Sequence, residues 1–169
     1  MPTIITHALV PAAIGAGIGR RVIPAPLLAA GAIAAMLPDL DVLGLRLGLS
    51  SHRGFTHSLA FAALLALAGA ACHRRLRAGF AVCFGFLFAA TASHGLLDAL
   101  TNGGSGIAFL WPFSDGRWFA PWRPVEVSPL GIRGFFTARG VEVLKSEVVC
   151  IWLPTLALAA AVFAGRRRK

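Results

Sequence analysis

The amino-acid sequence predicts an all-α integral membrane protein, a bundle of about five transmembrane helices in a single domain over residues 1–169. Two features of the composition lead to this prediction: 57% of the residues are hydrophobic and only 14% are charged. Soluble domains carry about 25% Asp, Glu, Lys and Arg, so this chain has too little charge to cover a surface that faces water. A third observation is that several apolar runs approach the roughly 20 residues that a helix needs to cross the hydrocarbon layer.

The first two predicted helices cover residues 4–19 and 23–37, and both are short. They are rich in Gly, Ala and Pro, and small residues let membrane helices approach one another closely. We therefore expect this pair to pack tightly inside the bundle. Pro24 and Pro26 suit a helix start, and Pro38 marks a helix end.

Three further apolar runs predict helices over residues 55–73, 78–100 and 147–164. Thr56 is the expected N-cap of the first of these. Pro154 lies inside the last run, where it should either kink the helix or be tolerated because neighbouring groups satisfy the freed backbone.

The segment 101–146 is different in kind, because it shows no helical period. It contains Trp111, Trp118 and Trp122 among Pro, Gly and Arg residues. Tryptophan beside membrane helices is typical of anchoring at the level of the lipid headgroups. Loops of this length are also often functional, so the segment is either an interfacial belt or an external lid over a site.

Basic residues follow the apolar runs in three clusters, at 20–21, 74–77 and 166–169, with nine Arg and Lys residues and no acid. The net charge of +9 could suggest nucleic-acid binding, which requires a basic face or stripe. Clusters at helix ends instead indicate contact with membrane lipids, and we expect no nucleic-acid partner. If all three clusters are cytoplasmic, the positive-inside rule places the N-terminus outside and the C-terminus inside a bacterial inner membrane.

This topology gathers four of the five histidines and three of the four aspartates in one layer near the external face. Ionisable residues are rare and costly inside membrane helices, where they mark functional sites. The helices hold no other group of polar side chains, so metal binding explains the layer economically. Its members are His7, Asp39, Asp41, His52, His57, His94 and Asp98.

The strongest pair in this layer is His94 and Asp98, because a four-residue spacing puts both side chains on one helix face. Imidazole and carboxylate groups both bind Zn²⁺. His7 lies a few residues into the first apolar run, and it is either a further ligand or a hydrogen-bonded core histidine. His73 belongs to the second basic cluster and is excluded.

Asp39 and Asp41 follow Pro38 at the end of an apolar helix, which is the unfavourable end of the helix dipole for acids. They are either a solvated helix terminus or joint site residues, one binding a metal and the other supporting it. In the segment 51–58, His52 lies in a short loop and His57 opens the next helix. Arg53 between them could hold a phosphate.

These segments together resemble the YdjM-like family of bacterial inner-membrane proteins, which are LexA-regulated and described as metal-dependent hydrolases. The resemblance covers most of the chain, and the segment His52–Ser58 is its most specific part. It implies a membrane hydrolase. The His and Asp order is more loosely similar to that of zinc-dependent phospholipase C enzymes, but this chain is too short and hydrophobic to be one. The matching segments are Thr6-His7, Pro38–Asp41, His52–Ser58, His94–Asp98, Asn102–Gly104, Trp111–Phe113, Pro121–Pro124 and Val127–Pro129.

The leading expectation is hydrolysis of a phosphoester in a lipid or lipid-linked substrate at the external face, with one or two divalent ions, preferably zinc. Asp41 would act as general base or support a ligand, and Arg53 or Arg123 would bind the phosphate. Two alternatives stay open: a non-catalytic metal-binding or metal-transport protein, and an amide hydrolase of the ceramidase-like kind. The expected metal ligands are His7, Asp39, His52, His57, His94 and Asp98.

Overall fold

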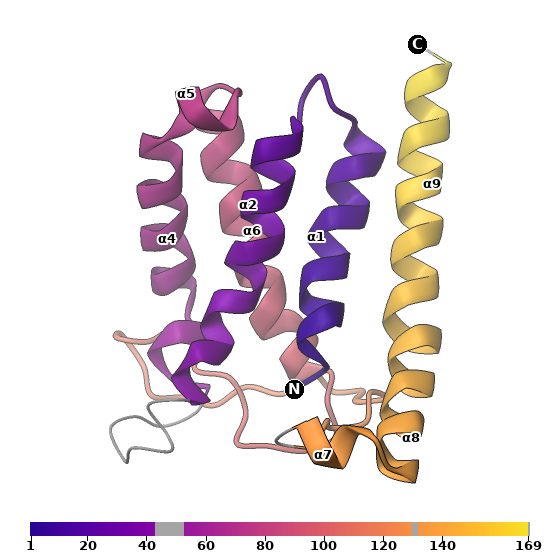
Figure 1. Ribbon diagram of the computed structural model, residues 1–169. Helices are drawn as coiled ribbons and strands as arrows, with labels where there is room; N and C mark the ends of the chain where they lie inside the picture. Colours follow the sequence, from indigo (N-terminus) through magenta and orange to yellow (C-terminus); the bar gives the residue numbers. More distant parts are fainter. Residues whose placement is uncertain (43–52, 130–131, 169) are drawn as a thin grey trace.

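The computed structural model describes residues 1–42, 53–129 and 132–168, and its regular structure is helical. Figure 1 shows a bundle of helices with roughly aligned axes, in which α1, α2, α4, α6 and α9 are the long members. The described residues form two isolated β-bridges, between Thr101 and Val125 and between Ile107 and Trp118, and no strand. The predicted all-α fold class is therefore confirmed.

Small residues of the first two helices allow close contact with neighbouring helices of the bundle, as the sequence predicts. A Cβ atom at Gly31 would lie 2.3 Å from an aromatic carbon of Phe86 in α6. A Cβ atom at Gly17 would lie 2.6 Å from the carbonyl oxygen of Ala159 in α9. The elements are α1 (Ile4–Ile18), α2 (Ala25–Met36) and the 3-10 turn η1 (Leu37–Leu40) that continues α2.

The run 55–73 forms several elements instead of one helix, because Ser58 starts a new helix. The Ser58 hydroxyl accepts a hydrogen bond from the Phe61 amide at 3.1 Å. The prediction that Thr56 is the N-cap is therefore wrong, and the Thr56 hydroxyl instead donates to Asp41 at 3.0 Å. The elements here are η2 (Phe55–His57), α4 (Leu59–Ala71), α5 (His73–Leu76) and α6 (Phe80–Ala99).

The main apolar core lies where α2, α4 and α6 meet, toward the end of the bundle that carries α5. The other end of the same helices is filled by the buried polar side chains described below. The fully buried core members are Leu27, Ala66, Ala70, Cys83 and Leu87.

The last helix begins at Ala138 instead of residue 147, so the prediction that 101–146 has no helical part is wrong. It is one continuous helix, Ala138–Arg167. A wider π-helical turn comes directly before Pro154, where the proline ring would otherwise meet the carbonyl four residues earlier. The elements are α7 (Ile132–Phe135), α8 (Ala138–Glu147), η3 (Val148–Trp152) and α9 (Leu153–Arg167).

Two helices in the described part of the chain are long and apolar enough to cross a membrane, α6 and Ala138–Arg167. Three apolar helices are shorter: Ile4–Ile18, Ala25–Leu40 and Leu59–Ala71. The C-terminal helix turns large apolar side chains outward, with Val149 62% exposed and Leu158 56% exposed. Contiguous apolar faces of this kind are uncommon on soluble proteins, so the helix surface is suited to lipid.

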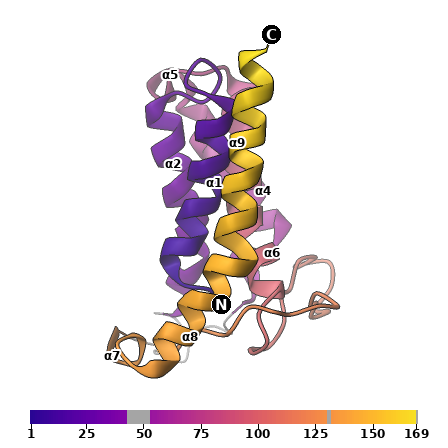
Figure 2. The ribbon, with the colours of Figure 1, turned by 90° about the vertical axis from the view of Figure 1, so that its right-hand side faces the viewer.

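The segments that carry the basic clusters lie at one end of the bundle (Figure 1). The C-terminus, α5 and the connection between α1 and α2 share one end, so the three basic clusters lie together. The Arg166 guanidinium donates to the Ile18 carbonyl there at 2.7 Å. Figure 2 shows α9 alongside α1, and the segment 101–129 projecting to one side at the opposite end, near the N-terminus.

Candidate metal centre

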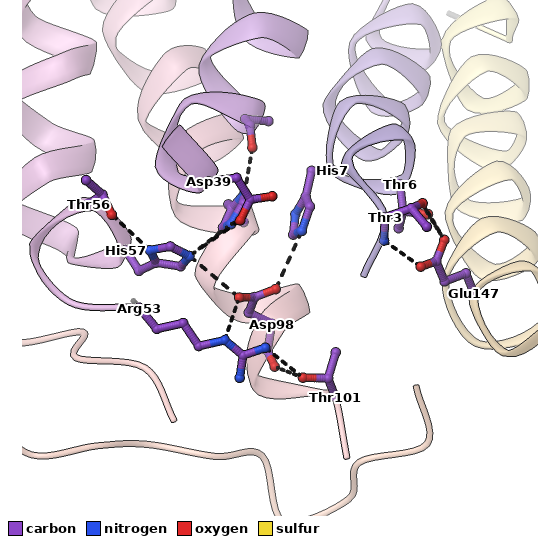
Figure 3. Close-up of polar contacts among 12 residues, drawn as sticks. Thr3, Thr6, His7, Asp39, Arg53, Thr56, His57, Asp98, Thr101 and Glu147 are labelled. Carbon is purple, nitrogen blue, oxygen red and sulfur yellow. Dashed lines mark hydrogen bonds and ion pairs between the residues drawn. The ribbon is translucent and has the colours of Figure 1, made fainter. Parts of the chain in front are cut away.

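Six of the side chains selected from the sequence lie together at the end of the bundle that holds the N-terminus (Figure 3). They come from four segments: α1, η1 with its C-cap, η2 and α6. Their side chains are between 0% and 7% exposed. His52, the seventh, falls outside the described residues. The six are His7, Asp39, Asp41, His57, His94 and Asp98.

The spacing of these groups fits a small divalent cation. Nε2 of His94 is 3.1 Å from Nε2 of His57 and 3.3 Å from Oδ1 of Asp39. Zn²⁺ binds imidazole nitrogen at about 2.0–2.1 Å in tetrahedral sites, which separates neighbouring ligand atoms by about 3.3 Å. Two overlapping groups have all their ligand atoms within 4.8 Å of one another: His7, Asp39 and His94, and His57, His94 and Asp98.

Hydrogen bonds turn Nε2 of two imidazoles toward the centre of the cluster. Nδ1 of His94 is 2.7 Å from the Ala35 carbonyl oxygen, which can only accept, so Nδ1 carries the proton. The Thr56 hydroxyl donates to Asp41 and therefore accepts from Nδ1 of His57, 3.0 Å away. Partners of this kind fix the tautomer and ring orientation of a metal-binding histidine, with Nε2 facing the other groups of the cluster.

The cluster also carries more negative charge than its own cation balances. Asp39, Asp41 and Asp98 meet one permanently charged basic side chain in the described part of the chain, Arg53, so the carboxylates outnumber it. Among the described residues, the oxygens of Asp39 and Asp98 have no partner in good hydrogen-bond geometry, and their contacts with basic side chains range from 3.0 Å to 3.9 Å. Burying such charges costs several kcal/mol per ion unless an opposite charge is present. A divalent cation would balance this excess.

The imidazole of His7 is also buried without well-formed hydrogen bonds to the described residues. The ring is fully buried, and neither of its nitrogens has a partner in good hydrogen-bond geometry within the described ranges. It stacks on His94 with ring centroids 3.7 Å apart, and its Nε2 is 3.5 Å from Asp98. A hydrogen-bonded core histidine, the alternative for this residue, would have a partner, so the geometry favours a ligand.

His57 lies in η2, outside the helices long enough to cross a membrane. Burial disfavours its charged form, but hydrogen bonds to Asp41 and Asp98 and their negative charges outweigh burial. The pKa of His57 is therefore raised above its ordinary value of 6.5. A metal that binds this ring has to displace the proton.

Arg53 links the cluster to the segment after α6. Its side chain is 1% exposed, and its Nε lies 3.0 Å from Asp98. Its two terminal nitrogens donate to the Gly103 carbonyl at 2.9 Å and the Thr101 hydroxyl at 3.2 Å, and its backbone N–H donates to Asp41 at 3.0 Å. These contacts favour a role in fixing the carboxylates, and the role in phosphate binding stays a prediction.

The tryptophan-rich segment 101–129 contacts the residues around Arg53 and Phe55, while some of its aromatic side chains face outward. Arg117 donates to the Arg53 carbonyl at 2.8 Å, and Trp111 packs against Phe55 with ring centroids 4.8 Å apart. Trp122 is 70% exposed, as an interfacial residue would be. The Arg123 guanidinium lies over the Phe119 ring at 4.7 Å, so the structure does not bring this predicted phosphate ligand into the cluster.

A second buried polar cluster shows that the helices do hold another group of polar side chains, contrary to the expectation. Glu147 is fully buried and accepts hydrogen bonds from the Thr3 amide at 2.5 Å, the Thr3 hydroxyl at 2.7 Å and the Thr6 hydroxyl at 2.6 Å. The Trp152 indole donates to Thr6 at 2.6 Å. A single acid directly before an apolar run is the only sequence signal of this cluster.

Comparison with known proteins agrees with the resemblance seen in the sequence. The family model described as YdjM inner membrane protein matches residues 1–168. Inner membrane protein YbcI of Escherichia coli (strain K12) is 47% identical over 173 residues, which cover 99% of this chain and 100% of the relative. No solved structure matches. Because the match runs over the whole length, the chain belongs to the YdjM inner membrane protein family.

Proposed function

We propose that this protein is a membrane-bound metal-dependent hydrolase that cleaves a phosphoester in a lipid or lipid-linked substrate at the external membrane face. The observation that carries the proposal is the convergence of buried carboxylates and imidazoles from four segments. Several of these groups lack a well-oriented hydrogen-bond partner in the part of the chain that the structure describes. Such a group is costly to bury without a cation. Membership of an inner membrane protein family supports the membrane setting.

The metal ligands would be His7, Asp39, His57, His94 and Asp98, with His52 as a further candidate. A mixed set of imidazole and carboxylate ligands suits Zn²⁺ better than Ca²⁺ or Mg²⁺, which prefer oxygen ligands alone. A bound ion would supply a water molecule with a pKa near 7 and would offset charge on the reacting group.

The protein's own residues would hold these ligands in place. The Ala35 carbonyl orients His94, and Thr56 together with Asp41 orients His57. Asp41 is a candidate general base, but its Oδ2 already accepts from the Arg53 amide and the Thr56 hydroxyl. These bonds favour the supporting role for Asp41.

The external location rests on the separation of charge along the bundle. The basic clusters gather at one end and the polar cluster lies at the other (Figure 1). With five crossings and the basic end in the cytoplasm, the N-terminus would be outside, the C-terminus inside and the site near the external leaflet. The segment 101–129 would then lie at the headgroup level, as an interfacial belt or a partial lid.

The alternative is a non-catalytic metal-binding or metal-transport protein with the same ligands. A transport pathway needs polar groups through the whole membrane depth. The core residues toward the basic end are Leu, Ala, Cys and Phe, which counts against a pathway. An amide hydrolase would share the metal site, so the substrate panel below includes both bond types.

The first test is the metal content of protein purified in detergent, measured by elemental mass spectrometry. Wild type should hold about one or two divalent ions per chain, as structural and catalytic zinc sites do. The His94→Ala, Asp98→Ala double variant should hold none and should melt at a lower temperature, because a bound metal stabilises the folded state by mass action. Equal metal content in both proteins would remove the basis of the proposal.

The second test is turnover. Metal-loaded protein in liposomes is presented with a panel of phosphoester and amide lipids, and His57→Ala serves as the inactive control. Asp41→Asn should lose part of both metal and activity if Asp41 supports His57, but should lose activity alone if it is the base. Absence of turnover together with ion movement across the liposome membrane would favour the transport alternative.

A further inference from the structure

An apolar groove follows the line where α1 and α6 face each other. It has a volume of about 400 Å³, and it is lined along α6 from Val82 to Ser93 and along α1 from Val10 to Ile18. Those eleven steps along α6 correspond to about 16 Å at the rise of an α-helix. The groove is therefore long and narrow.

One end of the groove lies one helical turn from the candidate metal centre, whose His7 and His94 rings are buried and do not line the groove. Ala90 lines the groove, and His94 lies one helical turn further along the same face of α6. Val10 and Pro11 line the opposite wall, and His7 lies one turn before them in α1. The rings of His7 and His94 stack 3.7 Å apart, so the pair lies directly beyond this end.

The chemistry of the lining excludes a polar occupant. The side chains are Val, Ile, Pro, Phe and Ala, with one hydroxyl, Ser93, which already donates to the Ala90 carbonyl at 2.7 Å. No lining residue is charged. An occupant that contacts such a lining over this length is an extended hydrocarbon chain, because a compact apolar molecule would leave most of the groove empty.

We propose that the groove between α1 and α6 binds one acyl chain of a membrane lipid and places the polar end of that lipid at the His7 and His94 pair. The substrate class that follows is a lipid with a long acyl chain, and this part rests on the proposed hydrolase function. Binding itself depends only on the groove. The apolar outer surface of the bundle and the inner-membrane family supply the lipid phase from which the chain would enter.

Gly85 allows a direct test, because it lines the groove and a Cβ atom there meets nothing within 4 Å. Gly85→Leu therefore starts from open space at Cβ and adds a branched side chain to the lining of the groove. Gly165→Leu is the matched control: it places the same side chain in open space on α9, away from the groove. Both substitutions replace a helical glycine, so neither should impair folding.

The measurement uses vesicles of phosphatidylethanolamine and phosphatidylglycerol that contain a phospholipid with a photoreactive acyl chain. After irradiation, labelled peptides are mapped by mass spectrometry. Label in wild type should concentrate on residues 10–18 and 82–93. Gly85→Leu should lower it there about tenfold, since the leucine displaces several methylenes of the bound chain, and Gly165→Leu should not change it.

Three results would overturn the inference: label spread evenly over all outward helix faces, label at the groove that Gly85→Leu leaves unchanged, or cross-links from the groove to a second copy of the chain. The His94→Ala, Asp98→Ala variant separates this inference from the proposed function. Groove labelling should persist in that variant while hydrolysis is lost. Groove labelling in a wild-type protein that hydrolyses no lipid contradicts the function alone. Lipid hydrolysis without groove labelling contradicts the groove alone.

Discussion

The backbone conformation of Arg53 and the contacts of its guanidinium are both tightly constrained. Its backbone φ is 63°, in the left-handed region that side chains other than glycine rarely occupy. A Cβ atom on Gly104 would lie 2.2 Å from the Arg53 guanidinium, so the segment after α6 approaches it through a glycine. Backbone strain of this kind persists where surrounding contacts fix it, and it is often found at functional sites.

Arg53→Met should therefore destabilise the protein and weaken metal retention. It leaves the Asp98 carboxylate buried without its cation, a loss of about 3–5 kcal/mol when one partner of a buried pair is removed. Thermal unfolding in detergent and metal content measure the two effects. Arg123→Met is the matched control, because Arg123 lies over Phe119 and outside the cluster. If Arg123→Met alone lowers lipid turnover while metal content stays intact, Arg123 binds the phosphate as the sequence suggests.

From the raised pKa of His57 we expect the thermal stability of the metal-free protein and that of the metal-loaded protein to change with pH in opposite directions. Its raised pKa means that the folded metal-free protein binds a proton more tightly than the unfolded chain. That stabilisation is fully present below the unfolded pKa and is lost as pH rises through the folded pKa. The metal-loaded protein needs the ring deprotonated, so it should lose metal and stability as pH falls. Melting temperatures with and without chelator from pH 5 to 8 would show the crossing, and parallel curves would contradict it.

At the scale of helices, the sequence predicts most elements because apolar runs end at Pro, Gly and basic residues. The run 78–100 becomes α6, Phe80–Ala99, within two residues at each end. The start of the last helix at Ala138 could not be predicted from apolar runs, because α8 is amphipathic. In α8, Val143 is buried while Glu142 is exposed. An apolar run predicts only the part of a helix that is suited to lipid. This helix begins at Ala138, nine residues before the apolar run that starts at residue 147.

Glu147 joins this long helix to α1, and its burial cannot be predicted locally. The Thr3 and Thr6 groups that satisfy it are more than 140 residues away in sequence. We expect Glu147→Ala to lower thermal stability clearly, because three buried donors lose their acceptor at about 1–3 kcal/mol for each unsatisfied group. Metal content should persist in protein that remains folded.

The matched control is Glu142→Ala in the same helix, whose side chain is 62% exposed and pairs with Arg139 at 3.3 Å. Exposed substitutions of this kind usually change stability by less than about 0.5 kcal/mol. If Glu147→Ala and Glu142→Ala lowered the thermal stability equally, Glu147 would not be holding α1 and the C-terminal helix together.

At the scale of the whole molecule, the residues of the candidate site could be predicted from the sequence, but the contacts that orient their side chains could not. The rarity of ionisable residues in apolar helices singles out His7, Asp39, His57, His94 and Asp98, and the structure brings them together. The supporting contacts depend on tertiary placement: the Ala35 carbonyl at His94 and the Arg53 guanidinium at Asp98 leave no sequence pattern. Residue types therefore indicate the chemistry, whereas the fold determines which partner each group receives.

The proposed orientation of the bundle in the membrane rests on the same separation of charged segments. The described basic residues at 20–21, 74–77 and 166–168 share one end of the bundle (Figure 1). By the positive-inside rule, positively charged loops of membrane proteins tend to stay in the cytoplasm. A fluorescent reporter that folds only in the cytoplasm should therefore be active after Lys169 and in the 74–77 loop. A phosphatase reporter that folds only outside should be active when inserted at Gly116, an exposed residue at the opposite end. Phosphatase activity after Lys169 would reverse the orientation and move the metal centre to the cytoplasmic leaflet, where a cytoplasmic lipid would become the expected substrate.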